Sequence, residues 1–534
     1  MIPQVKGIPD IIQQGLDAGW KTWNGSQLQQ DIHLEADVVI IGTGAGGGTA
    51  AEILSKAGLK VIMVEEGPLK SSNQFNMQER EAFSDLYQEG LARASKDGAI
   101  TILQGRCVGG STTVNWTSSF RTPPETLNHW TQEHQLKGFT EAEMAPWFDQ
   151  MEARLNIEKW ALPPNANNSI ISKGCDAKQY DWKIIPRNVT GCWNLGYCGT
   201  GCPTNAKQSM LVTTIPSTLN QNGELVYLAQ ARELIIENQK VTGVKCVGLK
   251  SDIVSRTGHS ITVKARHTIM ACGGINGPGL LLRSDAPDPY SRIGKRTFLH
   301  PVSFSVADFE GVINGFYGAP QSVYSDHFQW QNGAKGPMGY KIEVNPMQPA
   351  FMAAVIMGHG DQHKEQMQNL PHLNSMLALL RDGFDAQSEG GTIELRDNGA
   401  PVVDYPINDY IRDGLKRSLL SMAEIQFAAG AKRVRPVHTQ TGFSSTMSDL
   451  KSVVNELDCA TNAVRIGCAH VMGGCAMGEN PENSVVDSRG KFHHLDNLSI
   501  MDGSIFPTSI GANPQLSIYG MVARQATELA QQLV

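Results

Sequence analysis

The stretch between residues 36 and 65 limits the folds open to this chain more than any other part of it. It opens with Ala36–Ile41, a short apolar run rich in β-branched residues, which is typical of a buried strand. A glycine-rich turn, Gly42–Gly48, and a segment with helical spacing follow. A second apolar run, Lys60–Val64, ends on Glu65. This order predicts a βαβ unit, the building block of α/β folds that bind dinucleotides.

The turn carries the spacing Gly42-x-Gly44-x-x-Gly47. In such a turn the first glycine permits the sharp bend, the second lets the backbone approach a pyrophosphate, and the third lets helix and strand pack closely. Glu65 is placed to bond a ribose hydroxyl, and its charge disfavours the 2′-phosphate of NADP. The spacing leaves NAD and FAD open, together with a turn that binds nothing.

A second glycine patch lies at residues 105–115, GRCVGGSTTVN. It combines small residues with hydroxyl and amide groups. Such a loop can run flat beside a planar ring system and hydrogen-bond its polar edge. From composition alone, an ordinary surface loop explains the patch equally well.

The α/β pattern returns at two later places in the chain. A strand-like run followed by a helical turn lies near residues 266–282, and another strand-like run and a closing helix lie at residues 498–529. Between these pieces, residues 306–460 mix strand-like alternation with apolar runs such as Leu373–Leu380, which we assign to helix. We therefore expect a nucleotide-binding domain in several sequence pieces, interrupted by insertions that form a second domain. The expected boundaries are 1–33 for a lead-in, 34–118, 208–305 and 461–534 for the nucleotide-binding domain, and 119–207 and 306–460 for the second domain.

Charge and hydropathy exclude several classes of protein. The net charge is −7 and no long run of Lys or Arg occurs, which argues against nucleic acid as the main partner. The first residues do not resemble a secretory signal, and no apolar stretch reaches the roughly 18 residues of a transmembrane helix. We expect a cytoplasmic protein, with peripheral contact to the inner membrane left open.

Three motifs together resemble one family, the glucose–methanol–choline (GMC) oxidoreductases. They are the N-terminal GTGAGGG…VEEG, the internal GRCVGGSTTVNW, and the C-terminal CAHVMGGCAMG…NLSIMDGSIFPTSIGANPQ. Within the family, the block GYCGTGC and the segment IGKRTFLHP are most similar to the long-chain fatty alcohol oxidases. The resemblance implies an α/β (overall α+β) fold, in which a Rossmann-like FAD-binding domain joins a substrate domain with an antiparallel sheet.

The resemblance also assigns roles to particular residues. Gly42, Gly44, Gly47 and Glu65 match the family's glycine turn and acid. The flavin-contacting loop matches Gly109, Gly110, Ser111 and Asn115, and the segment along the flavin ribityl and pyrophosphate matches Asp502, Gly503 and Ser504. The catalytic histidine falls on His470, and the second polar residue at the flavin falls on Asn513. Some members link FAD to a histidine near this loop's closing asparagine. Here Val114 precedes Asn115 and the loop holds no histidine, so we expect non-covalent FAD.

The chemistry expected of this site is the oxidation of an alcohol. The α-hydride passes to flavin N5, His470 acts as the base for the hydroxyl proton, and Asn513 orients the alcohol. We expect a hydrophobic alcohol, aliphatic, aromatic or cyclic, because Met347–Met357 and Met376–Leu380 offer apolar, Met-rich walls. Oxygen or a quinone-like carrier would reoxidise the flavin. The alternative is a non-redox lyase of the cyanohydrin type on the same fold.

Two further features carry no assigned role in the reaction. Cys192, Cys198 and Cys202 lie within eleven residues, and their spacing matches no ferredoxin pattern. We expect reduced thiols and no metal, with an iron–sulfur cluster left open. His300, in the segment LHP, is expected to be a packing residue.

Overall fold

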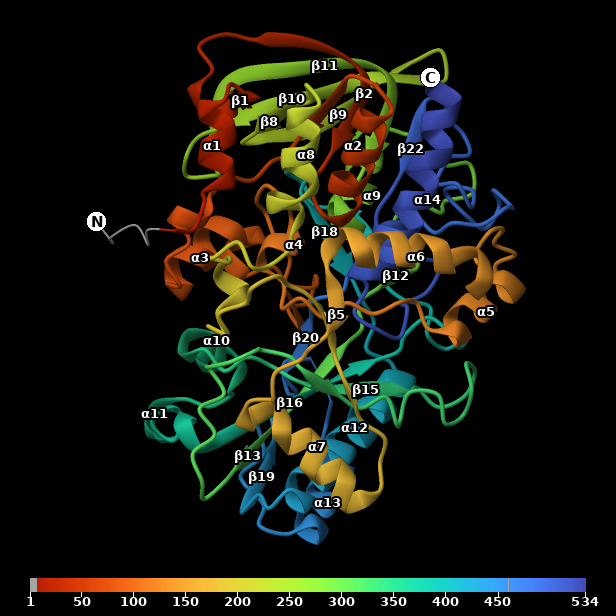
Figure 1. The fold of residues 1–534 in the computed structure, drawn as a ribbon. Helices are drawn as coiled ribbons and strands as arrows, with labels where there is room; N and C mark the ends of the chain where they lie inside the picture. Colours follow the sequence, from red (N-terminus) through yellow and green to blue (C-terminus); the bar gives the residue numbers. More distant parts are fainter. Residues whose placement is uncertain (1–6, 460) are drawn as a thin grey trace.

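The computed structural model describes residues 7–459 and 461–534. Residues 1–6 of the expected lead-in and residue 460, at an expected domain boundary, lie outside the described residues. Two large sheets organise the fold, one in the upper half of Figure 1 and the other in the lower half. The expected fold class is confirmed: a Rossmann-like sheet built from several sequence pieces joins a second, largely antiparallel sheet.

The upper sheet has eight strands drawn from distant parts of the chain. In order they are β1 (Lys21–Asn24), β8 (Glu224–Tyr227), β3 (Val61–Val64), β2 (Ile32–Ile41), β11 (Arg256–Met270), β10 (Lys240–Leu249) and β9 (Ala229–Glu237), with β22 (Leu498–Ile500) beside the end of β11. The pairs from β1 to β11 and the β11–β22 pair are parallel, whereas β9, β10 and β11 form an antiparallel meander. Strand β3 is buried on both faces, as parallel strands covered by helices are.

Helices cover this sheet, and the glycine turn joins strand β2 to the first of them. Helix α2 (Ala45–Lys56) follows β2 directly, and α8 (Thr214–Asn220) and the C-terminal α14 (Gln515–Leu533) pack against it. Helix α6 (Glu141–Leu155) packs against α14, and the two helices are neighbours in Figure 1. Helix α9 (Gly273–Arg283) begins just after β11. The expected strand and helix near residues 266–282 and the expected closing helix are therefore present.

The lower sheet has six strands. They are β15 (Tyr340–Val344), β16 (Leu373–Leu380), β13 (Val302–Asp308), β20 (Ile466–Cys468) and β4 (Ile100–Ile102), with β19 (Arg433–Pro436) also paired to β13. All of its pairs are antiparallel except β20–β4. Helices α12 (Asp409–Ala428), α7 (Ala166–Lys178) and α13 (Met447–Glu456) lie beside it (Figure 1).

The assignment of Leu373–Leu380 to helix is wrong. The segment is strand β16, and all eight of its residues are buried. A central strand covered on both faces is apolar throughout, so it lacks the polar–apolar alternation that would distinguish it from a buried helix.

Three short strands belong to a sheet other than the one that the expected domain boundaries would give them. Strand β1, from the expected lead-in, joins the upper sheet, and β4 and β20, from the expected nucleotide-binding pieces, join the lower one. The segments that follow β4 and β20 therefore run between the two sheets. This crossing brings residues 103–115 and 469–475 to the level where a ligand can lie between the domains.

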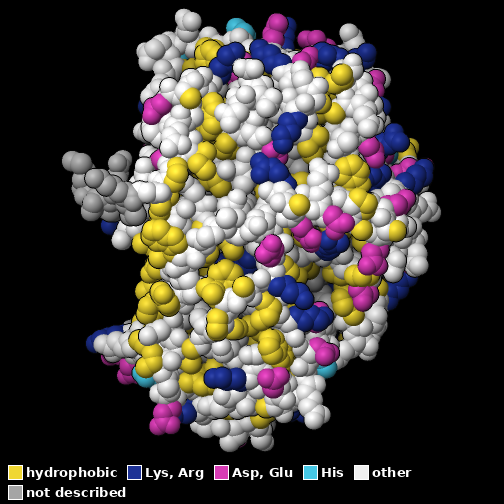
Figure 2. Space-filling model, viewed as in Figure 1, with side chains coloured by type: hydrophobic (Ala, Val, Ile, Leu, Met, Phe, Trp, Pro, Cys, Tyr) yellow, Lys and Arg dark blue, Asp and Glu magenta, His cyan; other side chains and the backbone are white. Residues whose placement is uncertain are grey.

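The remaining elements are short. The helices are α1 (Ile11–Asp17), α3 (Glu79–Leu86), α4 (Ser111–Val114), α5 (Pro124–Glu133), α10 (Pro349–Val355) and α11 (Gly360–Gln368). The strands are β5 (Ile157–Lys159), β6 (Lys183–Ile184), β7 (Pro186–Asn188), β12 (Thr297–Phe298), β14 (Val323–Tyr324), β17 (Thr392–Leu395), β18 (Pro401–Asp404) and β21 (Met472–Gly473). Figure 2 shows charged and apolar side chains mixed on one face, with apolar ones gathered along its left edge. Among the described residues, no helix is long and apolar enough to cross a bilayer.

Candidate active site

A cavity of about 750 Å³ lies between the two sheets. Its walls come from the glycine turn after β2, the segment after β4, the start of α9, strands β13, β15 and β16, and the segment after β20. Ten of the predicted site residues line it: Gly42, Gly44, Glu65, Gly110, Ser111, Asn115, His470, Asp502, Gly503 and Asn513. The other three, Gly47, Gly109 and Ser504, support the walls from behind.

The glycine turn forms one end of the cavity. Gly42 has φ +99°, a left-handed conformation that favours glycine, and a side chain there would overlap the carbonyl of Ala271. A side chain on Gly47 would overlap the carbonyl of Gly42, so the third glycine is needed for close packing of helix and strand. Gly44 is the N-cap of helix α2 and provides no side-chain cap, so the first amides of the helix are available to bind an anion.

Glu65 lies buried beneath this turn. Its Oε2 accepts hydrogen bonds from the amide and the hydroxyl of Thr43, at 3.1 and 2.7 Å, and its Oε1 accepts one from the Gly67 amide at 2.9 Å. Burial raises the pKa of Glu65. The Thr43 hydroxyl also accepts a 2.9 Å bond from the amide of Gly109. Thr43, which the sequence did not single out, thus ties the acid to the second glycine patch.

The two glycine patches lie against one another. A side chain on Gly110 would come within 2.8 Å of the Cα of Gly44, so the second patch could not approach the first as closely with a larger residue at position 110. Beyond this contact, Asn115 donates to the side chain of Gln515 at 2.7 Å, at the start of α14. Residues 105–115 do not form the flat loop expected throughout, because Ser111–Val114 is the short helix α4; contacts with Gly44 and Gln515 hold this patch in place.

The closing segment completes this end. The carboxylate of Asp502 accepts hydrogen bonds from the amides of Gly273 and Ser504, both at 2.7 Å, and burial raises its pKa. A side chain on Gly46 would overlap the carbonyl of Met501. An uncapped helix start, a buried acid and glycine backbones with no room for side chains fit a dinucleotide whose pyrophosphate lies at α2.

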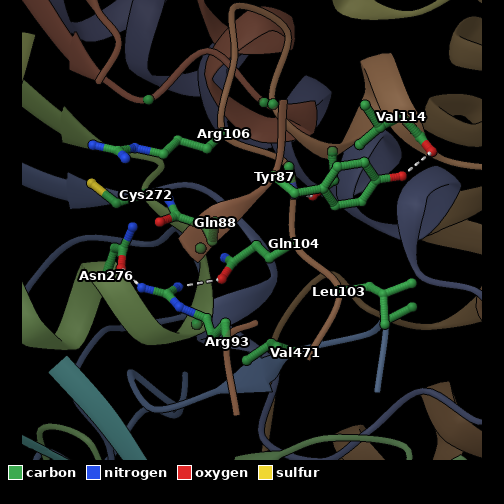
Figure 3. A pocket seen from close by; sticks show the side chains of 18 of the residues that line it. Tyr87, Gln88, Arg93, Leu103, Gln104, Arg106, Val114, Cys272, Asn276 and Val471 are labelled. Carbon is green, nitrogen blue, oxygen red and sulfur yellow. Dashed lines mark hydrogen bonds between the residues drawn. The ribbon is translucent and has the colours of Figure 1, made fainter. Parts of the chain in front are cut away.

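Polar side chains outside the predicted set line the same cavity. In Figure 3 the arginine, glutamine and asparagine side chains gather towards the left, whereas Tyr87, Leu103 and Val114 lie on the right. Arg93 donates to Gln104 at 2.6 Å and to Asn276 at 3.0 Å. These residues come from three separate segments, and none belongs to a recognisable motif. Their proximity therefore became apparent only from the three-dimensional structure.

His470 lines the cavity on the substrate-sheet side, immediately after β20. His470 is half-buried with part of its surface facing the cavity, and burial lowers its pKa to about 3. Its Nδ1 lies 3.3 Å from Nδ1 of His300, which is buried. The expectation that His300 is a packing residue is therefore incomplete, because its ring contacts the proposed catalytic histidine.

Asn513 lies beside a buried ion pair on β15. Lys341 Nζ is 2.8 Å from Glu343 Oε1 and donates to Asn513 Oδ1 at 2.9 Å. Asn513 Nδ2 donates to Glu343 Oε2 at 3.3 Å. Because a lysine ammonium can only donate, the amide oxygen of Asn513 must face Lys341. One N–H of Asn513 is then left for a ligand in the cavity. Neither member of the ion pair was expected from the sequence.

An apolar wall continues from these polar residues. It belongs to a hydrophobic cluster on the lower sheet and lines the cavity with Leu103, Trp116, Val302, Phe304, Phe351, Leu377 and Leu379. Of the two segments expected to supply Met-rich walls, only Phe351, Leu377 and Leu379 face the cavity. Met347 and Met352 lie in the core behind it. The wall is apolar as expected, but it is not built from methionine.

The three clustered cysteines, Cys192, Cys198 and Cys202, do not line the cavity. Each is half-buried, and Arg187 donates to Cys198 Sγ at 3.7 Å. Across residues 7–459 and 461–534, no group of three or more His, Cys, Asp or Glu is arranged to hold a metal ion.

Comparison with known proteins identifies the family. A model of the GMC oxidoreductases matches residues 83–302 and 386–522, and a model of an FAD binding domain matches residues 37–78. The chain belongs to the GMC oxidoreductases. Membership makes it an FAD-dependent oxidoreductase that acts on CH–OH groups, and the glycine cradle described above fits that cofactor.

Curated relatives are similar to this chain in sequence, and solved structures are similar to it in fold. A long-chain-alcohol oxidase of Arabidopsis thaliana, FAO4A, is 28% identical over 93% of this chain and 68% of its own length. The 6'''-hydroxyparomomycin C oxidase of Streptomyces lividus is 25% identical over 93% of this chain and 92% of its own. Pyridoxine 4-oxidase has a similar fold, with a TM-score of 0.67 at 16% identity over 92% of this chain and 98% of that one. Formate oxidase of Aspergillus oryzae gives 0.69 at 14% identity over 95% of this chain and 100% of that one.

Proposed function

We propose that this GMC oxidoreductase is an alcohol oxidase for a hydrophobic alcohol, which it converts to the aldehyde or ketone. The observation that carries the proposal is the cavity itself, which is lined by His470 and Asn513, here called its polar foot, together with the apolar wall. A hydroxyl group would bind at the polar foot while the hydrocarbon lies along Leu377, Leu379 and Phe304. The Arabidopsis relatives named long-chain-alcohol oxidases support the same substrate class.

Each residue at the foot has a proposed task. His470 and Asn513 both bind the alcohol oxygen, and Asn513 directs the α-C–H towards the hydride acceptor. FAD, when bound, supplies the hydride acceptor. Gly42, Gly44, Glu65 and Asp502 would hold its dinucleotide part.

The isoalloxazine side would lie along the second patch and the closing segment. Gly109, Gly110, Ser111 and Asn115 form that patch, and Gly503 and Ser504 belong to that segment. We propose non-covalent attachment, because Val114 stands where a linking histidine would be needed. Molecular oxygen is the proposed electron acceptor, and a quinone-like carrier is the competing one.

Anaerobic mixing with a panel of alcohols tests the proposal. A hydrophobic alcohol should bleach the yellow flavin, and later admission of oxygen should restore the colour. A flavin that stays yellow with every alcohol would favour the non-redox lyase instead. Bleaching without recovery in oxygen would favour a dehydrogenase that uses another acceptor.

A further inference from the structure

His300 occupies an unusual backbone conformation next to the proposed catalytic histidine. Its φ is +46°, in the left-handed region that non-glycine residues rarely adopt, and Pro301 follows it. The buried carboxylate of Asp382 holds this bend, because it accepts hydrogen bonds from the amides of Leu299 at 3.0 Å and His300 at 3.2 Å. Strain that is held in place by specific contacts is typical of functional sites.

The bend places each nitrogen of the His300 ring against a defined partner. Nε2 accepts a 3.1 Å hydrogen bond from the amide of Gly511. Nδ1 lies 3.3 Å from Nδ1 of His470. Gly511 lies in the same loop as Asn513, which follows it by two residues. His300 therefore connects the two residues proposed to hold the alcohol oxygen.

These contacts determine where the protons lie. A backbone amide can only donate, so Nε2 of His300 must carry a lone pair. A neutral imidazole has one N–H, so the proton of His300 is on Nδ1 and points at His470. Nδ1 of His470 must then be the acceptor, since two N–H groups would otherwise face each other. Burial lowers the pKa of both rings, so both histidines are neutral near pH 7.

We propose that His300 is a positioning residue that locks His470 in the tautomer with its proton on Nε2. The resting site then offers the alcohol oxygen two donors, Nε2–H of His470 and the free N–H of Asn513. Two N–H donors at one oxygen orient the alcohol and stabilise the negative charge that develops there as the hydride leaves. In this tautomer His470 has no free lone pair, so it acts as a donor rather than as the base expected from the sequence, and the hydroxyl proton leaves to water in the cavity. This inference rests on the proposed function for the identity of that oxygen, but the tautomer itself follows from contacts within the protein.

Nitrogen NMR tests the tautomer without substrate or turnover. The holoprotein is labelled with ¹⁵N at histidine only, and the His470 signals are identified by their loss in His470→Gln. We expect Nε2 of His470 to resonate as a protonated, pyrrole-type nitrogen and Nδ1 as an unprotonated, pyridine-type one. The reverse pattern would overturn the proposal, whatever the protein does with alcohols.

A matched pair of variants tests the role of His300. His300→Asn and His300→Asp have the same shape, and both residue types tolerate the left-handed backbone. Asn can keep a donor at the position of Nδ1, whereas the carboxylate of Asp can only accept and should move the His470 proton to Nδ1. FAD content and circular dichroism identify variants that fail to fold, and in that event the wild-type spectrum alone decides.

Kinetics give the second readout. Losing one donor to the oxygen should slow flavin reduction in His300→Asp by about 10²-fold, whereas His300→Asn should stay much closer to wild type. A purely structural role predicts equal losses in both variants and an unchanged tautomer. If His300→Asp folds and its His470 keeps the proton on Nε2, the proposal fails.

Discussion

The apolar wall makes a quantitative prediction about chain length. Phe304, Leu377 and Leu379 are almost fully buried, with exposed fractions of 7%, 4% and 4%. An alkyl chain that binds against these side chains moves from water to an apolar surface. Each added methylene should therefore stabilise the bound alcohol by the full transfer free energy, about 0.8 kcal/mol. Because about 1.4 kcal/mol is a factor of ten, kcat/KM should rise about fourfold per carbon. Hexanol and decanol differ by four methylenes, so their ratio should reach the order of 10².

A pair of leucines on the same strand turns this into a mutational test. Leu377 lines the cavity, whereas Leu373 is equally buried in the same cluster but lies outside the lining. Either Leu→Ala change should destabilise the fold by about 2–5 kcal/mol. Only Leu377→Ala removes a contact with the substrate chain. The decanol-to-hexanol ratio should therefore fall about fourfold or more in Leu377→Ala, a loss worth at least one methylene, and stay unchanged in Leu373→Ala.

The assay is stopped-flow flavin reduction under anaerobic conditions, with each n-alcohol from butanol to dodecanol. Rates at low substrate give kcat/KM without interference from reoxidation. A flat series, or a greater rate with glucose or choline than with decanol, would refute the reasoning. So would equal effects of the two leucine variants, because the wall would then act only through stability.

Further predictions concern the polar foot of the cavity and the cofactor. His470→Ala should slow flavin reduction about 10²–10⁴-fold with normal FAD content; a wild-type rate would make His470 a packing residue. Because burial lowers the pKa of His470 to about 3, its ring stays neutral as pH falls from 8 to 5. A limb of kcat/KM near pH 6.5 that disappears in His470→Gln would contradict this. Acid precipitation should release yellow flavin, and colour left on the polypeptide would indicate covalent attachment. In urea titrations Lys341→Met should lose about 3–5 kcal/mol, because Glu343 is left buried without a counter-charge. Lys341→Met with Glu343→Leu should recover most of that loss, and a single variant as stable as the wild type would show the ion pair to be dispensable.

The dinucleotide end could be predicted from the sequence because its signals are local. Gly42, Gly44 and Glu65 lie within one βαβ unit, so backbone geometry alone relates them. The motif around His470 is equally compact. Motifs whose residues are close in sequence can be interpreted without knowing how distant parts of the chain fold.

The partners of His470 and Asn513 could not be found in this way. His300 is separated from His470 by 170 residues, and Lys341 from Asn513 by 172. A histidine before proline and a lysine in a strand are common, and neither signals a contact with a distant loop. These contacts depend on β13, β15 and β20 lying in one sheet, which no local pattern encodes.

One signal was nevertheless present in the sequence of β15, Tyr-Lys-Ile-Glu-Val. Side chains two apart in a strand lie on the same face, so Lys341 and Glu343 point the same way between apolar neighbours. Two opposite charges on one face of a strand that is otherwise apolar indicate a paired, buried site, because an unpaired charge there would be too costly. Such a pair needs a further polar partner to complete its hydrogen bonds, and here Asn513 is that partner. Charged residues two apart in an apolar strand can thus indicate a buried polar cluster before any fold is known.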